Sequence, residues 1–209
     1  MFEGIRLWWA KRKNRRKMDR VFRRREDPFG YRDSPYEKAR LEAMESALSE
    51  RQYRRALEVG CAEGDFTLRL AARAARVTAL DVSTLAIERA GRRLSAARGV
   101  ELVAGDLREW TPAEPGYDLI VLADVLYYLD KPGAKEAFDE QFRRLAAWLG
   151  DGGRLVLAHG FAGDAERAHR RSFRERFEAL GLKLVDETVV GEGLNGPVAC
   201  LLSVLERRA

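Results

Sequence analysis

The sequence predicts an α/β protein in which helices cover both faces of a mostly parallel sheet. Short apolar segments with strand character alternate with longer segments of helical periodicity from residue 34 to residue 180, a pattern typical of parallel sheets. Residues 117–123 are almost continuously apolar, as expected of a central strand that is covered on both sides. The last two expected strands follow each other without a helix, so we expect them to pair antiparallel.

Start signals mark the helices in the first half of the chain. Ser34 precedes Pro35 at the first helical position, and Glu37 stands three residues after this cap, which is the signature of a capped helix start. Ser83 is a second cap, and an Ala- and Leu-rich segment follows Gly64. The elements expected here are a helix at 35–49, a strand at 55–59, a helix at 65–73, a strand at 76–81 and a helix at 84–97.

Apolar periodicity defines the elements of the second half. Phe138, Phe142 and Leu145 recur on one side of a segment at helical spacing. An Asp-Gly-Gly turn at 151–153 leads into the next strand. The elements expected here are strands at 100–103 and 117–123, a helix at 134–148, a strand at 154–159, a helix at 164–180, and strands at 182–189 and 198–206.

The composition excludes several classes of protein. The chain has 209 residues, of which 46% are apolar and 34% charged, so it can bury a sizeable core and is not disordered. It has no run of 18 apolar residues and no secretory signal at its start, so we expect neither a membrane-spanning helix nor secretion. Two cysteines and two histidines are too few for a disulfide scaffold or a Cys/His zinc site. We therefore expect a cytoplasmic enzyme-sized domain without a metal.

Positive charge is concentrated at the N-terminus. Residues 1–27 hold eleven Lys or Arg and four Asp or Glu, a net charge of +7, while the rest of the chain carries −2. We therefore divide the chain into a basic arm, residues 1–30, and a domain, residues 31–209. The arm has three interpretations: a solvated helix that packs Trp8 and Trp9 on its own domain, a contact with an anionic membrane or nucleic acid, or a lid over the substrate. A membrane contact would make the protein membrane-peripheral.

Residues suited to a nucleoside follow three of the expected strands. After the first strand, Gly60 allows a tight turn and Gly64 opens a helix where a Cβ would crowd a ligand. This spacing is not the G-x-G-x-x-G of a dinucleotide site, which argues against NAD and FAD. The second strand ends at Asp81, whose carboxylate suits both hydroxyls of a ribose. After the third strand, Asp106 suits the amino group of an adenine and Leu107 suits its face.

Five ordered segments resemble the motifs of class I S-adenosylmethionine-dependent methyltransferases. They are LEVGCAEGDF (57–66), ALDVS (79–83), VAGDL (103–107), YDLIVLADVLYYL (117–129) and LGDGGRLVLAH (149–159). The resemblance implies a Rossmann-like fold with a seven-stranded, mostly parallel sheet and an antiparallel last strand. It also implies S-adenosylmethionine as the cofactor and S-adenosylhomocysteine as the product.

Three further segments are similar to the nodulation protein S family, whose members N-methylate an amino sugar of a chitooligosaccharide. They are Pro35-Tyr36-Glu37 with Arg40, the stretch 125–129, and Gly191-Glu192 with Asn195 ahead of Cys200-Leu201-Leu202. Two features depart from the family's pattern: Asp124 stands where Glu is expected, and the cationic arm is additional. Both departures concern the acceptor more than the cofactor.

The resemblance also implies which residues hold the cofactor. The loop after the first strand and Asp81 would hold its methionine and ribose parts, and Ala123 would border the sulfonium. Arg40 would reach the cofactor's carboxylate, or is instead a surface cation of its helix. The complete expected set is Arg40, Glu58, Gly60, Cys61, Ala62, Gly64, Asp81, Val82, Gly105, Asp106, Leu107 and Ala123.

Methyl transfer from a sulfonium is an in-line displacement with a good leaving group, so alignment is the main task and no metal is required. An amine acceptor must be neutral, so we expect a group near the cavity that accepts its proton. The candidates are Asp124, His159 and Tyr128. The alternative for His159 is a strand-end histidine that caps a loop. Asp124 could instead anchor the acceptor or hold a turn.

Missing motifs narrow the range of acceptors. The residues after the fourth strand are not the Asn/Asp-Pro-Pro-aromatic motif of enzymes that methylate exocyclic amines of bases. Neither Cys61 nor Cys200 follows a proline near that strand, as carbon-5 pyrimidine methylation requires. The sequence therefore favours transfer to an amine or hydroxyl of a small or carbohydrate-like acceptor, such as an amino sugar. The alternative is a binding module, or a methyltransferase, that the arm holds on a membrane lipid or RNA.

Overall fold

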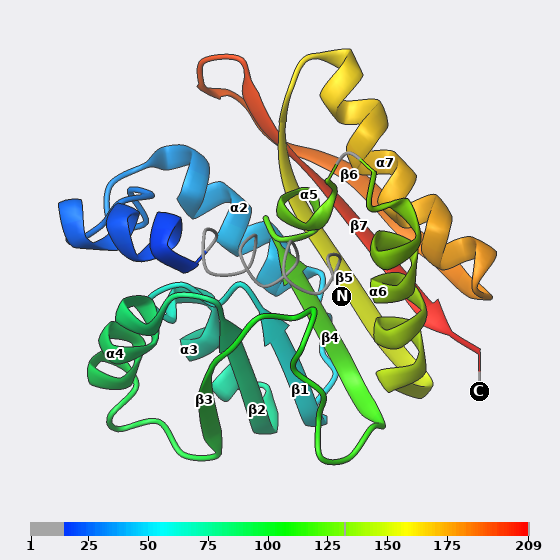
Figure 1. Cartoon of the computed structure of the whole chain (residues 1–209), viewed down its shortest axis with the longest axis horizontal. Coiled ribbons are helices and arrows are strands. Elements are labelled where there is room, and N and C mark those ends of the chain that lie inside the picture. The colour runs from blue at the N-terminus through cyan, green and yellow to red at the C-terminus, as the bar shows by residue number, and fades with distance from the viewer. Residues whose placement is uncertain (1–14, 132, 209) are drawn as a thin grey trace.

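The computed structural model describes residues 15–131 and 133–208 and contains one seven-stranded sheet in the order β3-β2-β1-β4-β5-β7-β6 (Figure 1). Its strands are β1 (Tyr53–Val59), β2 (Ala74–Asp81), β3 (Val100–Ala104), β4 (Tyr117–Ala123), β5 (Leu149–Ala162), β6 (Leu182–Asn195) and β7 (Val198–Arg207). The neighbours from β3 to β5 pair in parallel. β7 pairs antiparallel with both β5 and β6. The predicted fold class is confirmed, including the antiparallel last strand.

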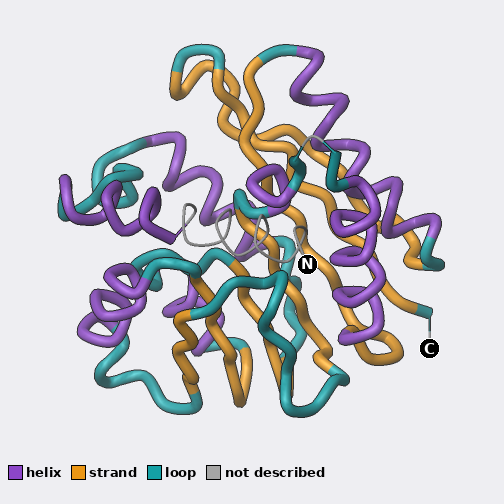
Figure 2. Tube along the Cα trace, in the orientation of Figure 1, coloured by secondary structure: helices purple, strands orange, loops and turns teal. Residues whose placement is uncertain are grey.

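The helices lie on both sides of this sheet (Figure 2). They are α2 (Pro35–Ser46), α3 (Asp65–Ala71), α4 (Thr84–Arg93), α5 (Leu126–Leu129), α6 (Lys135–Trp148) and α7 (Asp164–Ala179). Residues 15–24 of the arm are also helical. None of the helices in the described ranges combines the length and the apolar character needed to span a membrane.

The predicted caps start two of these helices. The Oγ of Ser34 accepts a hydrogen bond from the Glu37 N–H at 3.3 Å, and the Oγ of Ser83 accepts one from the Ala86 N–H at 3.2 Å. Each bond satisfies a backbone donor that has no partner inside its helix. These caps fix where α2 and α4 begin relative to the strands.

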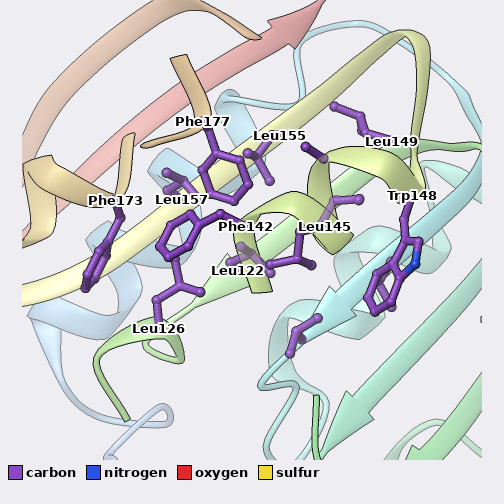
Figure 3. Close-up of a cluster of buried hydrophobic side chains, with 14 of the residues drawn as sticks. Leu122, Leu126, Phe142, Leu145, Trp148, Leu149, Leu155, Leu157, Phe173 and Phe177 are labelled. Carbon is purple, nitrogen blue, oxygen red and sulfur yellow. The ribbon is translucent and has the colours of Figure 1, made fainter. Parts of the chain in front are cut away.

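Two apolar clusters hold the helices on the sheet. On one face, α6 and α7 contribute the aromatic residues Phe142, Phe173 and Phe177 to a cluster with Leu122 and Leu155 of the strands (Figure 3). All five side chains are fully buried or nearly so. On the other face, α2 and α3 pack on alternate strand residues in a second cluster. Strands β1, β4 and β5 are therefore covered on both sides, as the apolar run at 117–123 predicts.

Some element bounds differ from those predicted. The helix expected at 84–97 ends at Arg93, and α5 was not expected. The strand expected at 154–159 extends over 149–162, with a register shift against β4 between Tyr117 and Leu119. The predicted turn at 151–153 thus lies within β5 as an irregularity. A four-residue helix such as α5 is too short to produce a periodic pattern in the sequence.

Candidate functional site

A cavity of about 180 Å³, open to solvent, lies where β1, β2, β3 and β4 end. Parallel strands bring their carboxyl ends to one edge of a sheet, and this edge is where ligands bind in such folds. Further lining residues come from the arm, from α2 and Tyr31 before it, and from α5 and Val125 before it. Nine residues of the expected cofactor set line the cavity: Arg40, Gly60, Ala62, Asp81, Val82, Gly105, Asp106, Leu107 and Ala123.

Glu58 and Cys61 line a second, much smaller cavity of about 10 Å³, which Arg40 and Gly60 also line. The carboxylate of Glu58 accepts a hydrogen bond from the Thr67 hydroxyl at 2.6 Å. Burial raises the pKa of Glu58 to about 7, and burial also raises the pKa of the Cys61 thiol. Both residues therefore border the smaller cavity, Glu58 from the end of β1 and Cys61 from the loop that follows it.

The two glycines of this loop have different roles. Gly60 has φ +84°, and a Cβ there would lie 2.8 Å from the Ala123 carbonyl oxygen, so β1 and β4 could not approach as they do. Gly64 has φ +85°, and its Cβ would meet Leu94 Cδ1 at 2.9 Å. Gly64 does not line the large cavity. The expectation that a Cβ at Gly64 would crowd the ligand is therefore corrected, because it would crowd Leu94 at the end of α4.

Asp81 presents a buried carboxylate to the cavity. One oxygen accepts a hydrogen bond from the Ala62 N–H at 3.1 Å and the other from the Ser83 N–H at 2.8 Å. Burial is the largest influence on this group and raises its pKa to about 6. Each carboxylate oxygen has a second lone pair, so the pair can also accept hydrogen bonds from two vicinal hydroxyls.

Asp106 and Leu107 line the same cavity on the loop after β3. Arg108 holds the Asp106 carboxylate with two side-chain bonds, Nε to Oδ1 at 2.9 Å and Nη2 to Oδ2 at 2.5 Å. Such a bidentate pair fixes the plane of the carboxylate. Leu107 is buried and offers an apolar side chain next to this acid.

Arg40 is the centre of a buried polar cluster at the cavity. Its side chain is only 3% exposed, which excludes the alternative of a surface cation. Its Nε donates to Glu37 Oε2 at 2.9 Å, and its Nη1 lies 3.4 Å from Asp124 Oδ2. Burial raises the pKa of Glu37, and Arg40 opposes that shift. The Tyr31 hydroxyl lies 3.5 Å from Arg40 Nη2, and all four residues border one of the two cavities.

Asp124 lines the cavity in an unusual backbone conformation. Its φ is +52°, a region that Asp adopts more readily than most residues with a side chain. Its Oδ1 accepts from the Gly160 N–H at 2.7 Å, and its own N–H donates to the Ala158 carbonyl at 2.9 Å. These bonds to β5 hold the carboxylate at the end of β4, where both it and Arg40 line the cavity.

His159 does not line either cavity. It lies behind α5, where its Nε2 accepts a hydrogen bond from the Leu126 N–H at 3.4 Å and its ring packs edge-on against Phe173. Burial lowers its pKa to about 4. The expectation that His159 accepts the acceptor's proton is therefore corrected, and the alternative of a histidine that caps a turn fits its position.

Tyr127 and Tyr128 both line the cavity from α5. Because they lie on a helical turn and not on a strand, their side chains do not point in opposite directions. Their rings are 4.6 Å apart. The Nζ of Lys17, on the arm, is 5.8 Å from the centre of the Tyr128 ring.

The described part of the arm, dark blue in Figure 1, contributes residues to the lining of the cavity. Phe22 is fully buried and packs with Ala62 and Ala86. The Ser83 hydroxyl donates to Asp19 at 2.6 Å, and Arg89 donates to three arm carbonyls, including that of Phe22 at 2.7 Å. The arm residues that line the cavity are Lys17, Met18, Phe22 and Phe29.

This position favours the interpretation of the arm as a cover over the site. These lining residues were not predicted from the sequence, although the apolar pair Met18 and Phe22, four residues apart among cations, marks one side of a helix. Trp8 and Trp9 lie outside the described residues. Glu192 and Asn195 are exposed on β6 and are not among the cavity residues. Within the described ranges, no group of three or more His, Cys, Asp or Glu is arranged to hold a metal.

Comparisons with known proteins show which family this chain is similar to. The family model described as nodulation protein S matches residues 12–162. Nodulation protein S of Sinorhizobium fredii is 30% identical over 87% of this chain and 84% of its own length. That of Rhizobium tropici is 37% identical over 67% of this chain, and the match spans 57% of its length. The crystal structure of N-methyltransferase NodS from Bradyrhizobium japonicum WM9 with S-adenosyl-L-homocysteine is 28% identical, with a TM-score of 0.80 over 93% of this chain and 98% of that one.

Proposed function

The chain belongs to the nodulation protein S family of S-adenosylmethionine-dependent methyltransferases, and we propose that it transfers the methyl group to an amine of a carbohydrate-like acceptor. The observation that carries the proposal is the cavity at the carboxyl ends of β1–β4, which brings a ribose-type carboxylate, Asp81, together with a second polar cluster around Arg40. The reaction requires that a nucleoside and an acceptor bind next to each other at the carboxyl ends of these strands. Asp81 would bind the nucleoside, and the cluster around Arg40 would border the acceptor.

The cofactor would lie across the strand ends. Asp81 would accept hydrogen bonds from the two ribose hydroxyls, and Asp106 and Leu107 would contact the adenine. Arg40 lines the cavity, and its contacts with the Tyr31 hydroxyl at 3.5 Å and the Met44 sulfur at 3.8 Å are long, so the cofactor's carboxylate would replace these weaker partners as an acceptor. The sulfonium would then lie near Ala123, beside Asp124.

The reaction is a single displacement. The lone pair of a neutral amine attacks the methyl carbon, the carbon–sulfur bond breaks, and S-adenosylhomocysteine leaves with the electron pair of that bond. Alignment of the two reactants can lower the barrier by roughly 7–11 kcal/mol. Asp124 accepts the proton that the nitrogen loses, because its carboxylate lines the cavity next to the sulfonium position. Tyr127 and Tyr128 form the acceptor's side of the cavity, and no step uses a metal.

The test is methyl transfer from labelled S-adenosylmethionine to a chitooligosaccharide with one free amine, compared with its fully N-acetylated counterpart. We expect label on the free amine only, and a rate that EDTA does not change. Asp124→Asn should lower kcat by about 10²–10⁴-fold while S-adenosylhomocysteine still binds. Asp151→Asn is the matched control, since Asp151 is exposed and is not a cavity residue. Equal labelling of the N-acetylated sugar would show transfer to a hydroxyl and contradict the proposal.

A second proposal concerns the arm, which carries exposed cations at Arg16, Arg20, Arg23 and Arg24. Successive residues of a helix turn by about 100°, so these side chains lie on the side away from the buried Phe22. We propose that this cationic face contacts anionic lipid headgroups, because each cation near such a surface contributes about 1 kcal/mol.

Vesicles with and without phosphatidylglycerol test this second proposal. Replacing Arg16, Arg20 and Arg23 by Ala should weaken binding to the anionic vesicles about a hundredfold. Binding to neutral vesicles should be negligible for both proteins. A wild-type protein that binds RNA and not anionic vesicles would contradict the membrane contact and support a nucleic-acid partner.

A further inference from the structure

The loop between β3 and β4 carries the residues expected at the adenine and has no regular secondary structure of its own. Its start is fixed by the Gly105 N–H, which donates to the Asp81 carbonyl at 2.9 Å. Its end is fixed by the Gly116 N–H, which donates to the Trp148 carbonyl at 2.9 Å. Residues 107–111 between these ends have no strand or helix ladder to hold them against the cavity.

One side chain of α6, Arg144, holds this loop. Its Nη1 donates to the carbonyls of Leu107 and Arg108 at 3.1 and 3.2 Å. Its Nη2 donates to the Trp110 carbonyl at 2.5 Å and lies 3.3 Å from the Thr111 hydroxyl. In the described part of the chain no ion pair to a carboxylate engages Arg144, so its charge is directed at backbone carbonyls, which strengthens those bonds.

Arg144 is itself fixed by α6. Its Nη1 also donates to Gln141 at 3.0 Å, and its guanidinium carbon lies 5.0 Å from the centre of the Trp148 ring. Trp148 packs edge-on against Trp110 of the loop at 5.6 Å. Because α6 is anchored in the core by buried aromatic residues such as Phe142, Arg144 ties the loop's backbone to the core, in addition to the packing of Leu107 and Trp110 on the same cluster.

We propose that Arg144 is a positioning residue for the base of the cofactor and sets the preference for adenine over hypoxanthine. The inference rests on the proposed function, in which Asp106 and Leu107 contact the base. Asp106 discriminates only if its carboxylate lies where the 6-amino group points, and a 6-keto group at that place would be repelled. Arg108 aims the carboxylate within the loop, and Arg144 places the loop relative to Asp81.

The test compares the affinities of S-adenosylhomocysteine and S-inosylhomocysteine by calorimetry in wild type, Arg144→Lys and Arg144→Met. A lysine has one ammonium and cannot span these four acceptors. We expect the affinity for S-adenosylhomocysteine to fall about tenfold in both variants. The affinity for S-inosylhomocysteine should change less, so the ratio of the two affinities should become smaller. The KM for S-adenosylmethionine should rise, while kcat at saturation stays within about twofold.

Arg143→Met is the matched control, because Arg143 is next in sequence but pairs with Glu140 in solvent. It should leave both affinities unchanged. Equal losses for the two ligands in the Arg144 variants would mean a general structural role and overturn the inference. A wild-type protein that binds neither ligand would instead contradict the proposed function. Thermal unfolding shows whether the variants are folded. If Arg144→Met does not fold, Arg144→Lys still allows the comparison of the two ligands.

Discussion

Burial raises the pKa values of two acids near the carboxyl ends of β1 and β2. It raises the pKa of Asp81 to about 6 and that of Glu58 to about 7. In both cases the folded protein holds the proton more tightly than the unfolded chain does. These two acids therefore contribute most to stability at low pH, and that contribution is lost as the pH rises through their folded pKa values.

The raised pKa of Asp81 predicts how cofactor affinity depends on pH. A protonated carboxyl accepts fewer hydrogen bonds from ribose hydroxyls, so the affinity for S-adenosylhomocysteine should fall as the pH is lowered through about 6. Calorimetry at several pH values measures this directly. Asp81→Asn should bind more weakly throughout and show no step in that range. A wild-type affinity that is constant across it would contradict the ribose role of Asp81.

Burial shifts the pKa of His159 downward, whereas it shifts those of Asp81 and Glu58 upward. Its folded pKa of about 4 lies below the usual value of 6.5, so the unfolded chain binds the proton more tightly. The stability that depends on neutral His159 is complete above pH 6.5 and is lost as the pH falls toward 4.

Two substitutions test this assignment of His159. His159→Leu should remove the low-pH loss, which amounts to at most about 3 kcal/mol, and should leave kcat near neutral pH unchanged. His159→Gln, which keeps an acceptor for the Leu126 N–H, is the matched variant. Denaturant unfolding against pH measures the first effect and steady-state kinetics the second. A loss of turnover at neutral pH in a fully folded variant would return His159 to the mechanism.

Single residues of the site differ in how well the sequence predicted them. Asp81, Asp106 and Ala123 border the cavity because each ends or directly follows a parallel strand, which is a property of local sequence. Gly64 and His159 also lie near strand ends, but their neighbours Leu94 and Phe173 come from distant segments. Sequence alone does not state which way a side chain at such a position faces.

Among the elements, the arm helix has the largest effect on the site. Phe22 fills a fully buried position, and replacing it by Ala should weaken arm packing by about 3–5 kcal/mol. Because the arm lines the cavity, we expect S-adenosylhomocysteine to dissociate at least about tenfold faster from Phe22→Ala. Stopped-flow displacement measures the rate. Arg24→Ala, at an exposed position of the same helix, should leave it unchanged, and equal rates in both variants would contradict the role of the arm.

The helices that have a clear start signal or an apolar face were predicted most accurately. The helices α2, α6 and α7 start within one residue of the predictions because caps and apolar spacing define them locally. The helix α5 was missed, and with it the shared orientation of Tyr127 and Tyr128. Its turn forms because the chain leaves β4 at Asp124 with a positive φ and its first N–H bonds to His159. Both causes are tertiary and leave no periodic signal.

For the whole molecule, the sequence predicted the sheet and the edge at which its ligands bind. The strand order places β1 and β4 side by side at the centre of the sheet. The strands that follow β1 and those that follow β4 continue in opposite directions across the sheet, and this change of direction opens a crevice at the carboxyl ends of β1 and β4. The docking of the arm could not be predicted, because it depends on contacts such as Arg89 with the carbonyls of residues 22, 25 and 26. A strongly cationic segment is more often solvated than packed.

A crystal structure of the protein with S-adenosylhomocysteine tests the central claim most directly. We expect one nucleoside across the ends of β1–β4, with both ribose hydroxyls on Asp81, the base against Leu107 and the amino acid part near Arg40. Density for the ligand at another place, or a cavity that stays empty at saturating ligand, would contradict this site.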